Sequence, residues 1–377
     1  MRPSISFRKG YLLPKSDRSR CPRLTRPQFE EILGDSAALV NRLIEKYIPR
    51  VYTAQKVASI CGPPRYKYPI EVLNKSISQP FWDLMDRGGK RWRPALFLTT
   101  YKALGGDPQE VLDLATIPEI VHNGTLIVDD VEDRSETRRG KKCIHRIYGE
   151  DVAINTGNTM YFAALQPLLK SSLRAEKKLA ILEIHAEEMT KVSFGQAMDI
   201  AWHRGLDKDV GEEEYLQMCL LKTASLSRMA VRMAATLAGA DEATSKALAE
   251  FAEAIGVAFQ IQDDILNLEG REEKYGKEIG GDITEGKRTL MVIYALSHLD
   301  PERRARLLSI LDSHTRDQRR IRDAVTILKQ SGAIEHAKRV AEKMVRDAWS
   351  RVDKLLPDSE SKGRLRMLAE FLVQRDF

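Results

Sequence analysis

The sequence predicts an all-α protein, with one large domain of roughly a dozen helices over residues 28–377. Apolar residues recur three and four positions apart through most of this range, which is the period of an amphipathic helix. No run alternates apolar and polar residues between turn signals, so no strand is expected. A hydrophobic fraction of 43% is ample for a packed core and rules out a wholly disordered chain.

The helical segments follow one another with short breaks between them. The clearest periods lie in residues 29–48, 176–201, 215–239 and 336–356. The breaks fall at residues 61–69, 105–108, 138–142, 205–213 and 356–361. None of these breaks resembles an interdomain linker and no repeat of 20 to 50 residues is visible, so a single bundle is predicted.

The basic charge of the chain belongs to its first 27 residues. Residues 1–27 contain eight Lys or Arg residues and one acid, so residues 28–377 carry 52 basic and 53 acidic residues. The net charge of +6 therefore does not mark the body as a nucleic-acid binder. The extension is rich in Arg, Ser and Pro and has no apolar core, which fits either a mitochondrial-type transit peptide or a disordered tail. The expected location is cytoplasmic or, with a transit peptide, mitochondrial.

The cysteines and the longest uncharged run narrow the class of protein further. Cys21, Cys61, Cys143 and Cys219 form no CxxC pair, which argues against a thiolate zinc site and favours a reducing compartment. The run at residues 152–169 contains Asn, Gln and Pro and is a poor membrane span. No P-loop, GxGxxG, GxSxG or HExxH motif is present. A soluble protein without a transmembrane segment is expected.

A first acidic cluster ends the apolar stretch of residues 121–133. Asp129 and Asp133 are four residues apart and share one helix face, with Asp130 beside them. Like charges in this relation destabilise a helix, and more so beside an apolar core. Taken alone, the cluster is equally well explained as a solvated acidic turn.

A second acidic cluster lies in residues 251–268, where a long apolar pattern carries Asp263, Asp264 and, one turn on, Asn267. Its apolar flanks argue against a fully solvated face. Both clusters are explained together if they face each other and share divalent cations. Oxygen ligands without nearby His or Cys favour magnesium, which keeps waters and commonly bridges to phosphate.

Basic residues stand in compact groups near the acidic clusters. Each group alone is more often a solvated basic turn, but together they suit a phosphorylated substrate, since Arg and Lys are the usual phosphate donors. The groups are Lys90, Arg91 and Arg93 in GGKRWRP (88–94), Arg138 and Arg139 in RSETRRGKK (134–142), Lys222, and Lys277 and Lys287 in residues 276–289. His122, seven residues before Asp129, is the one histidine within a motif, or else a buried core histidine.

These motifs, in this order and spacing, resemble those of the trans-isoprenyl diphosphate synthases, which include farnesyl, geranylgeranyl and longer polyprenyl diphosphate synthases. GGKRWRP is similar to their lysine–arginine element, DDVED (129–133) to their first aspartate-rich motif and FQIQDDILN (259–267) to their second. The resemblance runs from about residue 70 to the C-terminus. It implies an all-α homodimer that uses magnesium to condense an allylic diphosphate head to tail with isopentenyl diphosphate, releasing diphosphate.

The resemblance also implies roles for single residues. The implied metal ligands, for three ions per site, are Asp129, Asp133 and Asp263, supported by Asp130, Asp264 and Asn267. The implied clamp on the allylic diphosphate is Arg138, Lys222 and Lys277. The residues implied to bind isopentenyl diphosphate are Lys90, Arg93, His122 and Arg139, and Gly89 and Lys287 are further substrate-binding candidates. Thr223 and Gln260 are expected beside the reacting carbons, as catalytic residues with Lys222. Asn267 stands where many members have Asp, a form that geranylgeranyl synthases of animals and fungi share.

Product length is predicted from the residues that precede the first acidic cluster. If residues 112–133 form one helix, Gly124 and Thr125 line the cavity below the reacting carbon, and each turn adds roughly 5.4 Å of depth. Gly in a helix interior costs about 1 kcal/mol relative to Ala, so its presence suggests that space is needed, with tight helix packing as the alternative. Farnesyl-producing members often carry aromatics here. We therefore predict a product of about C20 or longer, with geranylgeranyl diphosphate favoured. The residues predicted to form the floor of this cavity are Val121 and Phe162.

Two other classes stay open at this point. An isoprenoid cyclase of the same fold would keep the first motif, but would not need GGKRWRP or FQIQDD. A non-catalytic partner subunit would usually lose the aspartates, which are present here.

Overall fold

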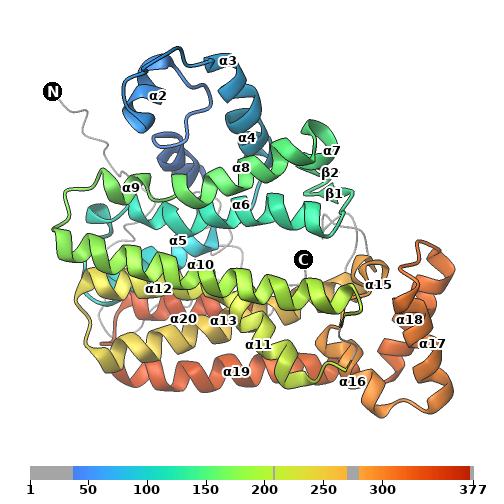
Figure 1. The fold of residues 1–377 in the computed structure, drawn as a ribbon. Helices are drawn as coiled ribbons and strands as arrows, with labels where there is room; N and C mark the ends of the chain where they lie inside the picture. Colours follow the sequence, from blue (N-terminus) through green and yellow to red (C-terminus); the bar gives the residue numbers. More distant parts are fainter. Residues whose placement is uncertain (1–36, 207–208, 270–279, 374–377) are drawn as a thin grey trace.

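The computed structural model describes residues 37–206, 209–269 and 280–373, and in this part of the chain the all-α prediction is confirmed (Figure 1). The predicted extension at residues 1–27 and the candidate Lys277 lie outside the described residues. Residues 37–45 are helical. The further helices are α2 (Ala54–Cys61), α3 (Ile70–Leu73), α4 (Gln79–Asp86), α5 (Trp92–Ala103), α6 (Ile117–Glu132), α7 (Ile144–Tyr148), α8 (Glu150–Ala163), α9 (Gln166–Leu169), α10 (Ala175–His203), α11 (Glu212–Lys222), α12 (Ala224–Ala238), α13 (Glu242–Glu269), α15 (Gly281–Glu285), α16 (Leu290–His298), α17 (Pro301–Asp312), α18 (Gln318–Gln330), α19 (Ala333–Leu355) and α20 (Glu360–Val373).

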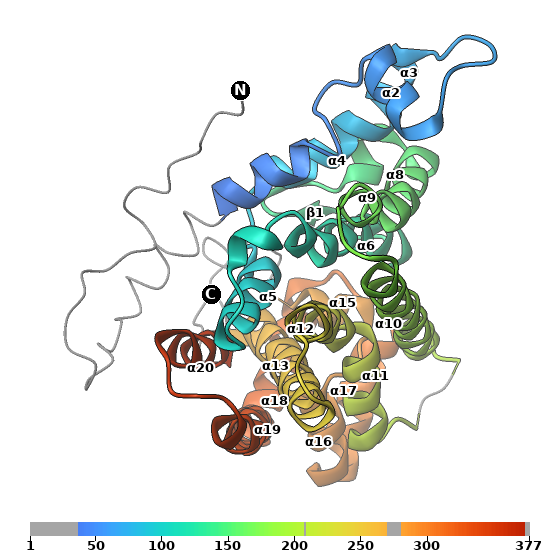
Figure 2. The ribbon, with the colours of Figure 1, turned by 90° about the vertical axis from the view of Figure 1, so that its left-hand side faces the viewer.

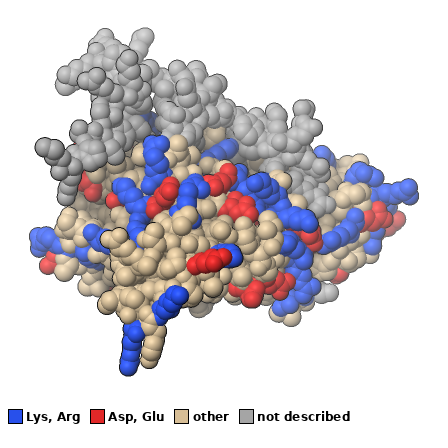
Figure 3. All heavy atoms as spheres, turned by 90° about the horizontal axis from the view of Figure 1, so that it is seen from above, with Lys and Arg blue, Asp and Glu red and all other residues tan. Residues whose placement is uncertain are grey.

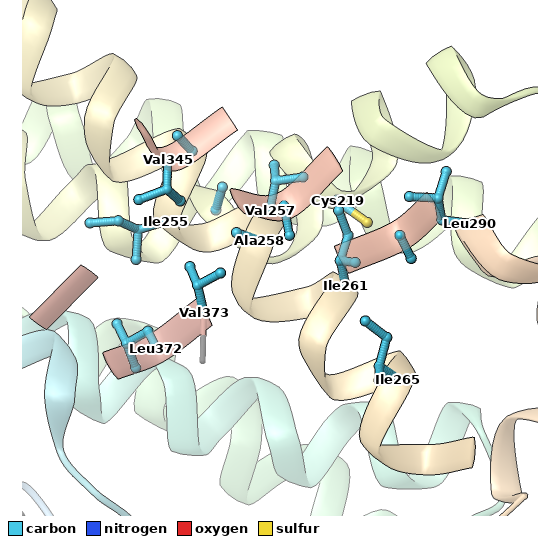
Figure 4. Packing of buried hydrophobic residues seen from close by; sticks show 14 of the residues in the cluster. Cys219, Ile255, Val257, Ala258, Ile261, Ile265, Leu290, Val345, Leu372 and Val373 are labelled. Atoms are coloured by element: carbon cyan, nitrogen blue, oxygen red, sulfur yellow. The ribbon is translucent and has the colours of Figure 1, made fainter. Parts of the chain in front are cut away.

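Helix α13 runs through the middle of the bundle, and other long helices surround it (Figure 2). Figure 4 shows Ile255, Ile261 and Ile265 of α13 among buried side chains that include Cys219 of α11 and Leu290 of α16. These side chains are shielded from water, and burial of apolar area of this kind is the main source of folding free energy. A second buried cluster joins α4, α5, α6, α8, α10 and α12. The helices that carry the two acidic motifs, α6 and α13, are therefore each held by a packed core.

The predicted helix at residues 215–239 is two helices, because α11 ends at Lys222 and α12 begins at Ala224. Ser225 Oγ donates a hydrogen bond to Leu221 O at 2.7 Å, and bonds of this i−4 type often bend helices. The predicted helix at residues 112–133 also begins later, at Ile117. Pro118 lies in its first turn, where backbone N–H groups have no partner within the helix, so the missing N–H of proline costs no hydrogen bond.

The predicted break at residues 138–142 contains a small antiparallel hairpin, although no strand is expected from the sequence. Strand β1 (Thr137–Arg138) pairs with β2 (Lys141–Lys142). The two turn residues, Arg139 and Gly140, have φ angles of 53° and 72°. Two successive residues with positive φ form the type I′ turn that suits a two-residue hairpin. The strands were missed because two residues are too few to show an alternating pattern.

Helices α10 and α11 are in very close contact at Gly195. A Cβ atom at this position would lie 2.3 Å from Lys222 N and 2.7 Å from Lys222 Cα. Only glycine allows this approach, so Gly195 fixes where the end of α11 lies against α10.

The surface agrees with the nearly neutral body that the sequence indicates. Figure 3 shows Lys and Arg interspersed with Asp and Glu on the face seen from above, outside the residues drawn in grey. Among the described helices, none combines the length and apolar character needed to cross a membrane.

Replacing Gly195 by Ala is expected to destabilise the fold, because the added methyl group overlaps the Lys222 backbone and forces α10 and α11 apart. Overpacking of this kind costs about 1–3 kcal/mol, which urea unfolding followed by circular dichroism would measure. Ser193→Ala, on the exposed face of α10, is the matched control and should stay within about 0.5 kcal/mol of the unmodified protein. Equal stability of the two variants would contradict the role of this contact.

Candidate active site

Lys222 joins three helices at the first acidic motif. Its ammonium lies 3.0 Å from Asp129 Oδ1 of α6 and 2.5 Å from Asp199 Oδ2 of α10. Gln196 of α10 also donates to Asp129 Oδ1, at 3.2 Å. Burial alone would lower the pKa of Lys222, but the two carboxylates outweigh it and raise this pKa, so the ammonium stays charged.

Asp199 and Gln196 were not identified from the sequence. They lie three residues apart on one face of α10, in the segment GQAMDI, and polar residues on a largely buried helix face were the available signal. Without a partner in the same sequence segment, this signal does not separate a site residue from a surface residue.

Lys287 connects the two acidic motifs. Its ammonium lies 3.2 Å from Asp133 Oδ2 and 2.6 Å from Glu285 Oε2. Burial is the largest influence on Asp133 and raises its pKa to about 7, against the lowering effect of Lys287. The charge of Lys287 also acts on Asp129 of α6, whose pKa is lowered by Lys222 and then by Lys287, and on Asp264 of α13, where it opposes the rise in pKa that burial causes. The carboxylates of the two motifs therefore share one electrostatic environment.

The second motif is held by a chain of hydrogen bonds. Tyr215 donates to Asp264 Oδ2 at 2.7 Å, and Gln260 Nε2 donates to Asp264 Oδ1 at 2.8 Å. Thr223 Oγ1 in turn donates to Gln260 Oε1 at 2.8 Å. Burial raises the pKa of Asp264 to about 6, although these two donors oppose the shift. The chain places Thr223, at the junction of α11 and α12, directly against α13, and Tyr215 is a further residue that sequence reasoning missed.

Asn267 anchors the segment that leads to Lys287. Its Oδ1 accepts a hydrogen bond from Asp282 N at 3.1 Å, in the first turn of α15, and its backbone oxygen accepts one from Gly280 N at 2.9 Å. Asn267 thus ties the end of α13 to the start of α15.

The carboxylates suit a hard cation, although they do not form a closed cluster. Within the described residues, no three His, Cys, Asp or Glu side chains converge as a ready-made metal site. Asp133 Oδ1 is nonetheless buried without a hydrogen-bond partner among the described residues, which leaves a carboxylate oxygen unsatisfied. Asp129 and Asp263 are only partly buried. Carboxylate oxygens of this kind are the ligands that magnesium prefers.

A second group of cations surrounds His122. Burial lowers the pKa of His122 strongly, and Arg93 and Arg139 lower it further, so its imidazole is neutral. Burial also lowers the pKa of Arg93 and of Arg139 to about 10 each. Arg93 Nε is buried without a hydrogen-bond partner among the described residues. Such a concentration of positive charge with an unused donor suits an anion.

The other predicted cations have protein partners in this structure. Arg138 donates to Asp130 Oδ1, with its Nε at 2.7 Å, and lies 3.4 Å from Asp129 Oδ2. The Lys90 ammonium lies 4.8 Å from the centre of the Phe371 ring on α20. Gly89 has a φ of 127°, and a Cβ there would lie 2.5 Å from an Arg91 nitrogen, so this glycine makes room for the arginines.

The sequence interpretation of Gly124 as a source of open space is wrong. A Cβ at Gly124 would lie 2.8 Å from Met160 Cβ and 3.0 Å from Gly157 O, so α6 and α8 pack tightly here. Phe162, a candidate for the cavity floor, is 75% exposed in this chain, and its role in product length stays a prediction. The other two candidates are Thr125, whose hydroxyl bonds its own helix at His122 O, and Val121, which is buried in the second core cluster.

Comparison with known proteins agrees with this geometry. The family model for polyprenyl synthetase matches residues 74–328. A short chain isoprenyl diphosphate synthase from Methanothermobacter thermautotrophicus is 37% identical over 78% of this chain and 88% of its own length. A geranylfarnesyl diphosphate synthase from Natronomonas pharaonis is 32% identical over 92% of this chain and 98% of its own.

Solved structures show the same fold. Geranylgeranyl pyrophosphate synthetase from Pyrococcus horikoshii superposes with a TM-score of 0.80 at 30% identity, covering 93% of this chain and 99% of that one. A geranylgeranyl pyrophosphate synthase from Corynebacterium glutamicum, solved with isoprenyl diphosphate and magnesium, has a TM-score of 0.77 at 25% identity, covering 93% and 100%. The cyclase and non-catalytic alternatives are thereby set aside. The chain belongs to the polyprenyl synthetase family, whose members use isoprenoid diphosphates and magnesium, and it is a prenyltransferase that elongates prenyl chains.

Proposed function

We propose that the protein catalyses the magnesium-dependent, head-to-tail condensation of isopentenyl diphosphate with an allylic diphosphate. The product is an all-trans prenyl diphosphate of about C20 or longer, with geranylgeranyl diphosphate favoured. The observation that carries this proposal is that Lys222 and Lys287 pair with carboxylates of the first aspartate motif, while the charge of Lys287 also acts on Asp264 of the second. Relatives named as geranylgeranyl and geranylfarnesyl diphosphate synthases support the length.

The allylic diphosphate would lie between the two motifs. Asp129, Asp133 and Asp263 would hold three magnesium ions, and Lys222 and Arg138 would contact the diphosphate oxygens beside them. Bound magnesium supplies positive charge against the negative charge that develops on the departing diphosphate. Lys222 is already charged and fixed by Asp129 and Asp199, so it needs little rearrangement when the allylic carbon–oxygen bond breaks.

Isopentenyl diphosphate would lie in the second group of cations. Arg93, Arg139 and Lys90 would neutralise its diphosphate, and neutral His122 would donate one further hydrogen bond. Its double bond then attacks the allylic carbon, forming a carbon–carbon bond, and the resulting cation loses a proton. No strong base lies at Thr223 or Gln260, so the released diphosphate accepts this proton.

The reaction class is tested by supplying radiolabelled isopentenyl diphosphate with C5, C10, C15 and C20 allylic partners and magnesium. We expect elongated prenyl diphosphates from the unmodified protein. Asp129→Asn should lower kcat by about 100-fold or more, because transition-state charge stabilisation by a metal is worth several kcal/mol. Asp358→Asn, an exposed aspartate on the surface, is the control and should leave the rate unchanged. Cyclised hydrocarbon, or no product, would contradict the proposal.

Tyr161 of α8 is the residue that we propose limits product length. The close contact of α6 and α8 brings its ring to 3.3 Å from the position of a Cβ at Gly124. Burial raises the pKa of Tyr161, and the charges of Glu132 and Asp129 raise it further. The ring therefore lies near the first motif, beside the part of α6 along which we propose that the growing chain extends.

Tyr161→Ala is expected to lengthen the product by one or more isoprenyl units, since removing the ring opens space beside Gly124. Mass spectrometry of the prenyl alcohols after dephosphorylation measures this length. Phe162→Ala, at the neighbouring exposed position, is the matched control and should leave the length unchanged. If Phe162→Ala changed the product length and Tyr161→Ala did not, the prediction that Phe162 forms the floor of the product cavity would be preferred.

We also propose a homodimer, formed through α8 and α10. These helices lie on the same side of the bundle in both ribbon views (Figures 1 and 2). Large apolar side chains are exposed on them, namely Ile154, Phe162, Leu179 and Phe194. Exposed apolar patches of this kind are typical of subunit interfaces.

Phe194→Glu should convert the protein to a monomer, because a charge would be buried at the proposed interface without a partner. Light scattering after size-exclusion chromatography measures the mass, which should be that of two chains before the substitution and one after it. Leu355→Glu places the same charge on an exposed leucine of α19 and should leave the mass unchanged. A dimeric Phe194→Glu variant would contradict this interface.

A further inference from the structure

The β1–β2 hairpin depends on contacts outside itself. Two strands of two residues each are too short to be stable alone. Arg139 also occupies a left-handed turn position that arginine disfavours, with a φ of 53°. The hairpin must therefore be held by the rest of the protein.

The end of α4 provides these contacts. Arg87, the residue after α4, has a side chain that is 1% exposed. Its Nη1 donates to Lys142 O at 2.8 Å and to Arg138 O at 3.2 Å, so one nitrogen binds both strands. In the opposite direction, Arg139 Nη1 donates to Leu84 O of α4 at 3.1 Å.

Asp83 holds the Arg87 side chain in this orientation. Arg87 Nε donates to Asp83 Oδ1 at 3.1 Å and to Asp83 O at 3.2 Å. Tyr148 of α7 donates to the other carboxylate oxygen, Asp83 Oδ2, at 3.2 Å. A buried guanidinium needs such a carboxylate partner, and the tyrosine restricts that carboxylate in turn. The result is a continuous set of contacts from α7 through α4 to the hairpin.

The hairpin places Arg138 at the first acidic motif and Arg139 among the cations around His122. Arg138 reaches the first acidic motif through Asp130 and Asp129. Arg139 lies among the cations around His122, where its charge lowers the pKa of that histidine. A shift of the hairpin would displace both arginines at once.

We propose that Arg87, supported by Asp83 and Tyr148, is a positioning residue that holds the hairpin so that Arg138 and Arg139 meet the two diphosphates. Arg87 lies outside every motif that the sequence analysis singled out. The inference rests on the proposed binding roles of Arg138 and Arg139.

Steady-state kinetics of Arg87→Gln test this inference. Losing the two hairpin bonds, which come from a charged donor, should raise KM for both the allylic substrate and isopentenyl diphosphate by about tenfold each, a change of about 1.4 kcal/mol. Arg87→Lys retains a charged donor and should give an intermediate KM. Hydrogen exchange of the amides in residues 137–142 should be faster in Arg87→Gln, which reports hairpin motion directly.

Arg50→Gln is the matched control. Arg50 pairs with Asp86 at the last residue of α4, through two bonds of 2.8 Å, and among the described residues it makes no hydrogen bond or ion pair with the hairpin. It should change neither KM value nor the exchange of residues 137–142. Should Arg87→Gln fail to fold, Tyr148→Phe leaves Arg87 in place, loosens Asp83 and should raise both KM values by about threefold, as expected for one weaker hydrogen bond.

Single variants of the hairpin arginines distinguish the positioning role of Arg87 from the binding roles of Arg138 and Arg139. If Arg138→Gln and Arg139→Gln raise KM while Arg87→Gln and Tyr148→Phe behave like Arg50→Gln, the positioning role is overturned and the proposed binding roles stand. If neither Arg138→Gln nor Arg139→Gln affects KM, the binding roles themselves fail, and the inference about Arg87 fails with them.

Discussion

The Lys222 ammonium, between Asp129 and Asp199, is the interaction on which the site most depends. Each of the three side chains comes from a different helix, so the ion pairs fix α6, α10 and α11 relative to one another. Buried charges are stable only when paired, and removal of one partner leaves another charge uncompensated. The close contact at Gly195 and the helix junction at Thr223 both serve the same geometry, because they bring the end of α11 to this point. The packing at Gly195 and the ion pairs of Lys222 therefore both position the end of α11.

Around His122, in contrast to Lys222, the buried cations are not fully paired with carboxylates. Burial lowers the pKa values of Arg93 and Arg139, the charge of Arg91 lowers that of Arg139 further, and Glu119 compensates them only in part. This arrangement lowers the stability of the free protein and becomes favourable when an anion enters. A site that is organised before binding in this way gains affinity, since little rearrangement is needed when the ligand arrives.

The sequence was sufficient to predict the fold class and the motifs, because helical periodicity and compact charged groups are local features. Asp199, Gln196 and Tyr215 escaped detection since their roles come from contacts with residues far away in the chain. Gly124 was misinterpreted for a related reason: a glycine in a helix indicates that a side chain is excluded, but not by what. Here the neighbour is α8. The break between α11 and α12 was missed because Lys222, Thr223 and Ala224 are all compatible with a continuous helix.

The hydrogen-bond chain through the second motif also has a direction. Both carboxylate oxygens of Asp264 accept hydrogen bonds, one from Tyr215 and the other from the amide nitrogen of Gln260. The amide oxygen then faces Thr223, whose single hydroxyl proton is committed to it. Thr223 is left with lone pairs alone for any other neighbour. A carboxylate deep in the bundle therefore determines that the threonine presents a partial negative charge, and not a proton, to whatever passes beside it.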